Sequence, residues 1–101
     1  MFFLFKYEAV LQGIVAIEVW KRSTTKARFR HVEFRIGDHD ESPKGLAQFS
    51  DNPLVGYYGN NSTDVEVVIF LTQKARGRFL TLQKFDAEYL EVDELFVHFQ
   101  E

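Results

Sequence analysis

The segment Phe29-Arg-His-Val-Glu-Phe-Arg-Ile36 decides the fold class, because apolar and polar side chains alternate along it. Val32, Phe34 and Ile36 fall on one face of an extended chain, and polar or charged residues fall on the other. Such alternation is typical of a β-strand that is buried on one face only. The segment therefore predicts a half-buried strand with these three side chains in the core.

The segment on its N-terminal side repeats the pattern. In Ile14-Val-Ala-Ile-Glu-Val-Trp20, the residues Val15, Ile17 and Val19 share one face. Between the two segments, Lys21-Arg-Ser-Thr-Thr-Lys-Ala27 is polar and typical of a turn. We therefore expect the two strands to form a hairpin joined by a basic loop.

Further strands are predicted from apolar and β-branched runs. Val65-Glu-Val-Val-Ile-Phe-Leu71 is mostly apolar, as expected of a strand covered on both faces. Gln73-Lys-Ala-Arg-Gly77 predicts a turn, and Arg78-Phe-Leu-Thr-Leu-Gln83 predicts another strand. Residues 37–61 hold both prolines and four of the six glycines, so we expect a long surface loop there.

The last segment fits two structures. Helical spacing relates five of its residues: Phe85, Tyr89, Val92, Phe96 and Phe99. The same segment also fits an extended strand whose inward face changes near Asp93, and a β-bulge would explain that change. The period alone leaves helix and strand open.

The composition predicts one folded domain, residues 1–101, and excludes several classes of protein. Apolar residues make up 46% and aromatic residues 16% of the chain, which excludes intrinsic disorder. The net charge of −3 at pH 7, with both signs interspersed, implies no attraction to nucleic acid. No apolar run approaches the ~20 residues of a membrane span. Lys6 and Glu8 interrupt the apolar opening before it matches a signal peptide.

The absence of cysteine sets a further limit. No disulfide and no thiolate site can form, and this composition favours the cytosol. The sequence also contains no nucleophile-elbow motif, phosphate-binding glycine loop or HExxH pair. These absences predict that the chain is not an enzyme.

Motifs in a fixed order resemble the F-type (fucose-binding) lectins. Val19-Trp-Lys-Arg-Ser-Thr-Thr-Lys-Ala-Arg28 resembles their hairpin V-x-I-x-N-R-x-D-x-x-x-x-R, and Val32-Glu-Phe-Arg-Ile-Gly37 resembles the strand N-V-E-V-R-V-G. Asn52-Pro-Leu-Val-Gly-Tyr-Tyr-Gly59 is similar to their loop N-P-x-C-G-x-Y-G. Gly77-Arg-Phe-Leu-Thr-Leu82 and Leu90-Glu-Val-Asp-Glu-Leu-Phe-Val97 resemble the two closing strands.

The resemblance implies an eight-stranded jelly-roll β-sandwich of the galactose-binding-like class, a fold shared with discoidin domains. It makes the last segment a strand. It begins late in the family pattern, so we expect the first strands and a sugar-facing His to be missing. The chain is then a piece of a longer protein, or a partner chain completes its open sheet.

The resemblance also implies a sugar site on the basic loop. The two arginines of the family motif fall on Lys21 and Arg28, and its aspartate falls on Ser23. Lys21 lacks the planar two-pronged donor of arginine, and Ser23 lacks the carboxylate that would hold it. A solvated basic hairpin without a ligand is the alternative interpretation of these residues.

A structural calcium ion is implied as well, through the pair Asp93 and Glu94 in the last strand. Calcium takes six to eight oxygen ligands, and the early loop that supplies most of them in the family has no counterpart here. Glu94 is otherwise expected to be an exposed strand residue.

Other candidates are weaker. Asp38-His-Asp-Glu41 gathers possible metal ligands, although a solvated loop explains it better. Asn60 and Asn61 begin overlapping N-glycosylation sequons, which matter only in a secreted chain. His31 and His98 are expected on outward strand faces. Trp20 is expected to pack at the hairpin mouth, although a lectin could use it as a sugar platform.

Two functions follow. The first is a lectin-like module that binds fucose or a related sugar on a glycan or glycoprotein, and the resemblance then implies an extracellular protein. The second is a degenerate sandwich that binds a protein partner or completes a larger chain without binding sugar. A phospholipid-binding discoidin domain is disfavoured, because the loop from Lys21 to Ala27 carries no apolar spike.

Overall fold

The computed structural model describes residues 3–21, 29–38, 52–59, 66–84 and 92–100. Over these residues the protein is all-β, as predicted, and contains no helix. The strands are β1 (Phe3–Lys21), β2 (Val32–Gly37), β3 (Leu54–Tyr58), β4 (Glu66–Lys84) and β5 (Val92–Phe99). They form one antiparallel five-stranded sheet in the order β3-β2-β4-β1-β5. The eight-stranded jelly roll stays a prediction.

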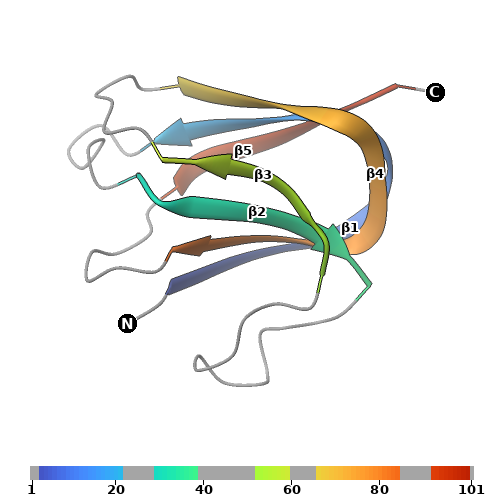
Figure 1. Ribbon diagram of the computed structural model, residues 1–101, viewed down its shortest axis with the longest axis horizontal. Coiled ribbons are helices and arrows are strands. Elements are labelled where there is room, and N and C mark those ends of the chain that lie inside the picture. The colour runs from blue at the N-terminus through green and yellow to red at the C-terminus, as the bar shows by residue number, and fades with distance from the viewer. Residues whose placement is uncertain (1–2, 22–28, 39–51, 60–65, 85–91, 101) are drawn as a thin grey trace.

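The sheet bends back on itself and makes two layers (Figure 1). Its two longest strands, β1 and β4, pair with each other from Phe3 opposite Lys84 to Trp20 opposite Glu66, and both curve through the bend. The first half of β4 and the whole of β5 flank the second half of β1, which makes a three-stranded layer. The second half of β4 lies between the first half of β1 and β2, with β3 beyond, which makes a four-stranded layer.

Register shifts and glycines explain the bend. The pairing of β1 with β4 shifts at three places between Glu8 and Ala16, and such irregularities increase local curvature. Gly13 lies there with a φ of +66°, a conformation that side chains disfavour. At Gly77 an added Cβ would come within 2.6 Å of the carbonyl oxygen of Gly37. The bend therefore needs glycine on both long strands.

Three expectations about connections are wrong. The predicted turn at Gln73–Gly77 lies inside β4, because the strand bends there without reversing. The predicted hairpin is not formed, because β4 separates β1 from β2 in the sheet. The predicted loop over residues 37–61 contains a strand, β3, which pairs with β2.

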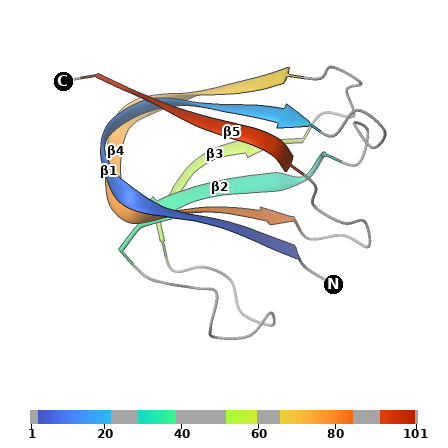
Figure 2. The same ribbon diagram turned by 180° about the vertical axis from the view of Figure 1, so that it is seen from behind.

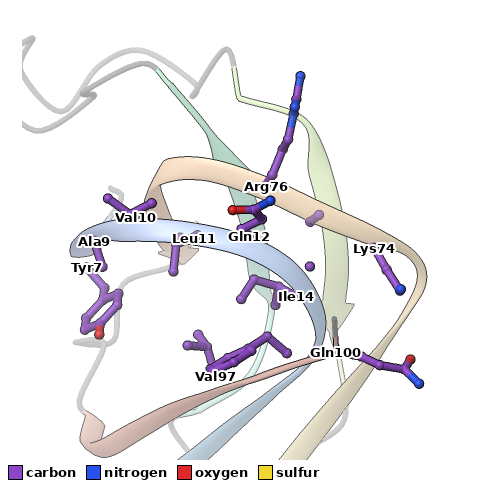
Figure 3. A pocket seen from close by; sticks show the side chains of 13 residues that line it. Tyr7, Ala9, Val10, Leu11, Gln12, Ile14, Lys74, Arg76, Val97 and Gln100 are labelled. Atoms are coloured by element: carbon purple, nitrogen blue, oxygen red, sulfur yellow. The ribbon is translucent and has the colours of Figure 1, made fainter.

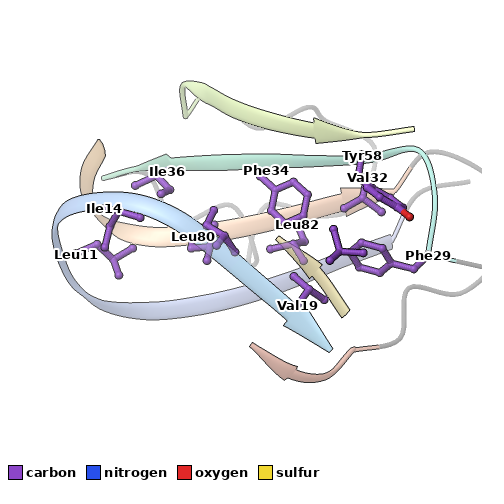
Figure 4. Close-up of a cluster of buried hydrophobic side chains, with 12 residues drawn as sticks. Leu11, Ile14, Val19, Phe29, Val32, Phe34, Ile36, Tyr58, Leu80 and Leu82 are labelled. Carbon is purple, nitrogen blue, oxygen red and sulfur yellow. The ribbon is translucent and has the colours of Figure 1, made fainter. Parts of the chain in front are cut away.

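The core fills the space between the two layers (Figure 4). Val32, Phe34 and Ile36 are buried in it, as predicted. β1 contributes Leu11, Ile14, Ile17 and Val19, β4 contributes Val67, Leu80 and Leu82, and Phe29 and Tyr58 complete the cluster. Ile14 takes the inward place predicted for Val15, because the register shifts between Ile14 and Ala16.

Strand β5 confirms the extended interpretation of the last segment. Lys21 pairs with Val92 and Trp20 pairs with Glu94, so Asp93 is an extra residue on β5. This is the predicted bulge. β5 lies at the edge of the three-stranded layer, beside β1 (Figure 2).

Candidate functional site: an aromatic and acidic sheet face

Lys21, the first predicted sugar ligand, lies at the end of β1 and is only 1% exposed. Its ammonium donates a hydrogen bond to Tyr58 Oη at 3.2 Å. The same nitrogen lies 4.9 Å from the centre of the Tyr58 ring and 5.8 Å from that of Phe29, within the range of a cation–π contact. The side chain is thus a buried contact between β1 and β3 and not part of an open basic loop.

Several other predicted positions lie outside the described residues. These are Arg28, Ser23, residues 39–41 of the acidic segment, and the sequon residues Asn60 and Asn61. Of the acidic segment only Asp38 is described, and it is exposed. His31 is exposed, as expected, and its Nδ1 lies 3.2 Å from Tyr57 Oη.

The predicted calcium ligands are Asp93, at the bulge of β5, and Glu94, opposite Trp20. Both are exposed. Across the described part of the chain, no three His, Cys, Asp or Glu side chains come together in a way that could hold a metal ion. Calcium needs six to eight oxygens, so the calcium ion stays a prediction.

A different site lies on the outer side of the three-stranded layer. We call it the aromatic–acidic face and define it by the outward side chains of three strands: Glu66, Val68 and Phe70 on β4, Ala16, Glu18 and Trp20 on β1, and Glu94, Phe96 and His98 on β5. Strand residues two apart point to the same side of a sheet, which is why each strand supplies three.

The pairing aligns these nine residues in three rows. Trp20 has Glu66 on one side and Glu94 on the other. In the next row Glu18 lies between Val68 and Phe96, and in the last row Ala16 lies between Phe70 and His98. Side chains directly opposite each other in antiparallel strands lie ~5 Å apart, so each row is one continuous patch.

The face is both apolar and open to solvent. Phe70 is 79% exposed and Phe96 is 46% exposed. This contradicts the prediction that residues 65–71 form a strand covered on both faces. Val67 does lie in the core, but the opposite side of β4 faces water with a large aromatic ring. Exposed aromatic rings grouped in this way mark interaction surfaces.

Glu18 is the hydrogen-bonding centre of the face. The indole N–H of Trp20 donates to Glu18 Oε2, and His98 Nε2 lies 2.9 Å from Glu18 Oε1. The Trp20 hydrogen bond, followed by the one with His98, lowers the pKa of Glu18 below its ordinary value. Glu18 therefore keeps its charge and holds the Trp20 ring in one orientation.

Glu66 responds in the opposite way. Its hydrogen bond with Glu18 raises the pKa of Glu66, and desolvation and the charge of Glu18 add to the rise. Two neighbouring carboxyl groups that share a hydrogen bond are expected to divide in this manner, since both cannot ionise without repulsion. The face thus combines a firmly ionised carboxylate with one that takes up a proton more readily.

Sequence patterns pointed to only part of this face. They place Trp20 and His98 on strands, but they do not reveal that β1 lies between β4 and β5. One signal in the sequence could have found the rest. Phe70 lies an even number of residues from Glu66, and Phe96 lies two residues from Glu94, so each ring shares a strand side with a charged residue, which marks that side as outward.

The part of the chain that the structure describes has no helix long and apolar enough to cross a membrane. No family model, curated protein or solved structure matches the chain.

Proposed function

We propose that this chain is a non-catalytic module that binds a basic, extended segment of a partner protein on the aromatic–acidic face. The observation that carries the proposal is the row in which Trp20 lies between Glu66 and Glu94. An aromatic ring flanked by carboxylates attracts a cation twice, through the ring face and through the charges. Arginine suits it best, because its planar group stacks on rings and pairs with carboxylates.

The remaining residues of the face support the same partner. The hydrogen bond to Glu18 fixes the Trp20 ring before binding, which reduces the entropy lost when a partner binds. Phe70 and Phe96 offer apolar contacts to side chains between the basic ones. Glu18 and Glu66 share a hydrogen bond and do not flank a space between them, which disfavours a catalytic acid and base acting on opposite sides of a substrate.

This proposal takes the second of the two functions expected from the sequence. A sugar site at Lys21 is disfavoured, because the Lys21 ammonium already lies between two rings of the core. The fold we propose is a shortened galactose-binding-like sandwich, and the two layers made by the bent sheet support it. Carbohydrate binding on the same face is kept as an outcome of the test.

The test measures binding of a peptide in which arginine alternates with valine, against a peptide with glutamine at each arginine. Trp20 is the only tryptophan in the chain, so its fluorescence reports on the face directly. We expect the arginine peptide to bind, and the affinity to fall about two- to fivefold in Glu94→Gln. Phe70→Ala should lower it further, without loss of stability, because this ring is exposed.

Matched controls lie elsewhere on the surface. Glu8→Gln removes the same charge from an exposed site beside Arg78, and Val10→Ala trims an exposed apolar side chain on the first half of β1. Both should bind like the unchanged protein. Equal binding of the glutamine peptide, or equal losses in Glu94→Gln and Glu8→Gln, would contradict the proposal. If a glycan array gives ligands and the peptide does not bind, the carbohydrate-binding function replaces it.

A further inference from the structure

A second surface feature is a hollow of about 840 Å³ beside the bend of the sheet (Figure 3). It opens between the first half of β1 and the end of β5. Its apolar lining includes Tyr7, Leu11, Ile14, Val97 and Phe99. The hollow is separate from the aromatic–acidic face. On β5 its lining residues Val97 and Phe99 point to the opposite side of the sheet from Phe96 and His98, and its residues on β1 and β4 lie outside the three rows of that face.

The sheet topology explains why the core is open here. β5 pairs with β1 only from Ile14 onward. Within the described ranges, the first half of β1 therefore has a neighbour on one side only, which is β4. A hydrogen bond of 2.9 Å from the Gln100 amide to the Gly13 carbonyl ties the end of β5 to the bend and closes one end of the hollow.

The lining is mostly apolar, and part of it faces water. Phe99 is 67% exposed, although it lies next to the half-buried Val97. Binding an apolar chain would remove this ring and Tyr7 from water, at a gain of roughly 25 cal/mol for each Å² covered. Ligand pockets are of this kind: a few hundred to 1,000 Å³, mostly apolar, with a small number of polar groups at chosen places.

The charges at the rim select the head of the ligand. Lys74 and Arg76 both contribute to the lining, and among the described residues no Asp or Glu does. This is notable in a chain with 15 acidic and 12 basic residues. In Figure 3 the two side chains extend from β4 away from the apolar floor and in different directions, so a head group near the solvent can meet either one. An anionic head is therefore favoured over a neutral or cationic one.

We propose that the hollow binds an amphiphile with an unbranched alkyl chain and a single carboxylate, that is, a long-chain fatty acid. The alkyl chain lies against Leu11, Ile14 and Val97 and extends the core to its open side. The carboxylate stays at the rim and pairs with Lys74 or Arg76. This site acts independently of the peptide-binding function proposed above.

Calorimetry on the full chain tests the proposal with three ligands of equal chain length, each below its micelle concentration: dodecanoate, dodecanol and dodecylammonium. We expect dodecanoate to bind most tightly. The double variant Lys74→Gln/Arg76→Gln should lower the affinity for dodecanoate about tenfold and leave the affinity for dodecanol unchanged. The reason is that a charge-assisted hydrogen bond contributes more than about 1.4 kcal/mol, the equivalent of a tenfold change. Arg78→Gln, an exposed cation outside the hollow, is the control and should change nothing.

A variant that fills the hollow tests its apolar part. Ala9→Phe places a ring among the lining residues and should abolish the binding of dodecanoate and dodecanol alike. If this variant unfolds, amide chemical shifts of the unchanged protein replace it: dodecanoate should move the signals of residues 7–14 and 97–100. Absence of dodecanoate binding, equal affinity for dodecylammonium, or shifts confined to other strands overturns the proposal.

Discussion

Lys21 illustrates how the surroundings of one residue decide its role. In the sequence it is part of a basic run and matches an arginine position of a sugar-binding motif. In the fold its stem is buried, and its ammonium is held by Tyr58 and Phe29, whose rings lie 5.6 Å apart. A buried ammonium is tolerated only where it is paired or hydrogen-bonded. Lys21 therefore stabilises the contact between layers.

Substitution of Lys21 should change stability. Lys21→Ala removes a buried side chain and leaves the Tyr58 hydroxyl with one partner fewer, so we expect a loss of about 2–4 kcal/mol in the free energy of unfolding. Lys21→Met keeps the packing and should lose only about 1 kcal/mol. Urea unfolding measures both. If both variants were as stable as the unchanged protein, the side chain would have to lie at the surface.

The carboxyl pair on the aromatic–acidic face gives a prediction about pH. The raised pKa of Glu66 means that protonated Glu66 favours the folded state, and this contribution is complete below the ordinary glutamate pKa. It is lost as the pH rises through the raised value. Glu66→Gln keeps a neutral donor beside Glu18 at every pH. Its melting temperature should therefore exceed that of the unchanged protein at neutral pH and equal it in acid.

The same variant separates stability from function. At neutral pH, Glu66→Gln should lower the affinity for the arginine peptide and raise the melting temperature. Opposite effects of this kind are expected where a surface keeps two charges that repel each other, such as Glu18 and Glu66, for the sake of binding. A melting-temperature difference that is the same in acid and at neutral pH would contradict the assigned pair. Glu18 shifts in the other direction: its lowered pKa gives stability above the ordinary value, lost as the pH falls through the lowered one.

At the scale of elements, alternation along the chain predicted faces correctly and neighbours poorly. Val32, Phe34 and Ile36 are buried, as predicted, because a period of two along the sequence shows which side of a strand is apolar. The bulge at Asp93 was visible for the same reason, since an extra residue interrupts the period. The period contains no information about which strand lies alongside. For this reason the prediction of a hairpin was wrong, and the aromatic–acidic face was not predicted.

The bend in β1 and β4 was hidden by a related ambiguity. Gln73-Lys-Ala-Arg-Gly77 has the composition of a turn, and composition does not distinguish a chain that reverses from a strand that curves. The deciding contacts are distant in sequence: Gly77 lies against Gly37, and Gly13 against Gln100. These contacts require the folded sheet and are absent from any local pattern.

The bend at Gly13 gives a prediction for an element. A side chain there would adopt an unfavourable positive φ, and its Cβ would come within 2.6 Å of the Gln100 carbonyl oxygen. Gly13→Ala should therefore cost more than about 1 kcal/mol in the free energy of unfolding. Gln12→Ala, an exposed neighbour, should stay within about 0.5 kcal/mol. Equal effects of the two substitutions would show that the bend does not depend on this glycine.

For the whole molecule, one bent sheet produces two surfaces with different properties. Its outer side over β4, β1 and β5 carries rings and carboxylates, and its open side beside the bend carries an apolar hollow with two cations. Both follow from the position of β1, which lies at the centre of one layer and at the edge of the other. Composition excluded a disordered chain, but these surfaces depend on the topology.

The position of β1 also has a consequence for biosynthesis. Among the described strands, β1 is made first, yet its partners are the last two: Phe3 pairs with Lys84, and Ile14 with Phe99. Sheets built on such distant pairings form slowly. During translation β1 therefore has no partner strand until β4 has been made, and in that interval its apolar side chains are a target for chaperones and a site of aggregation.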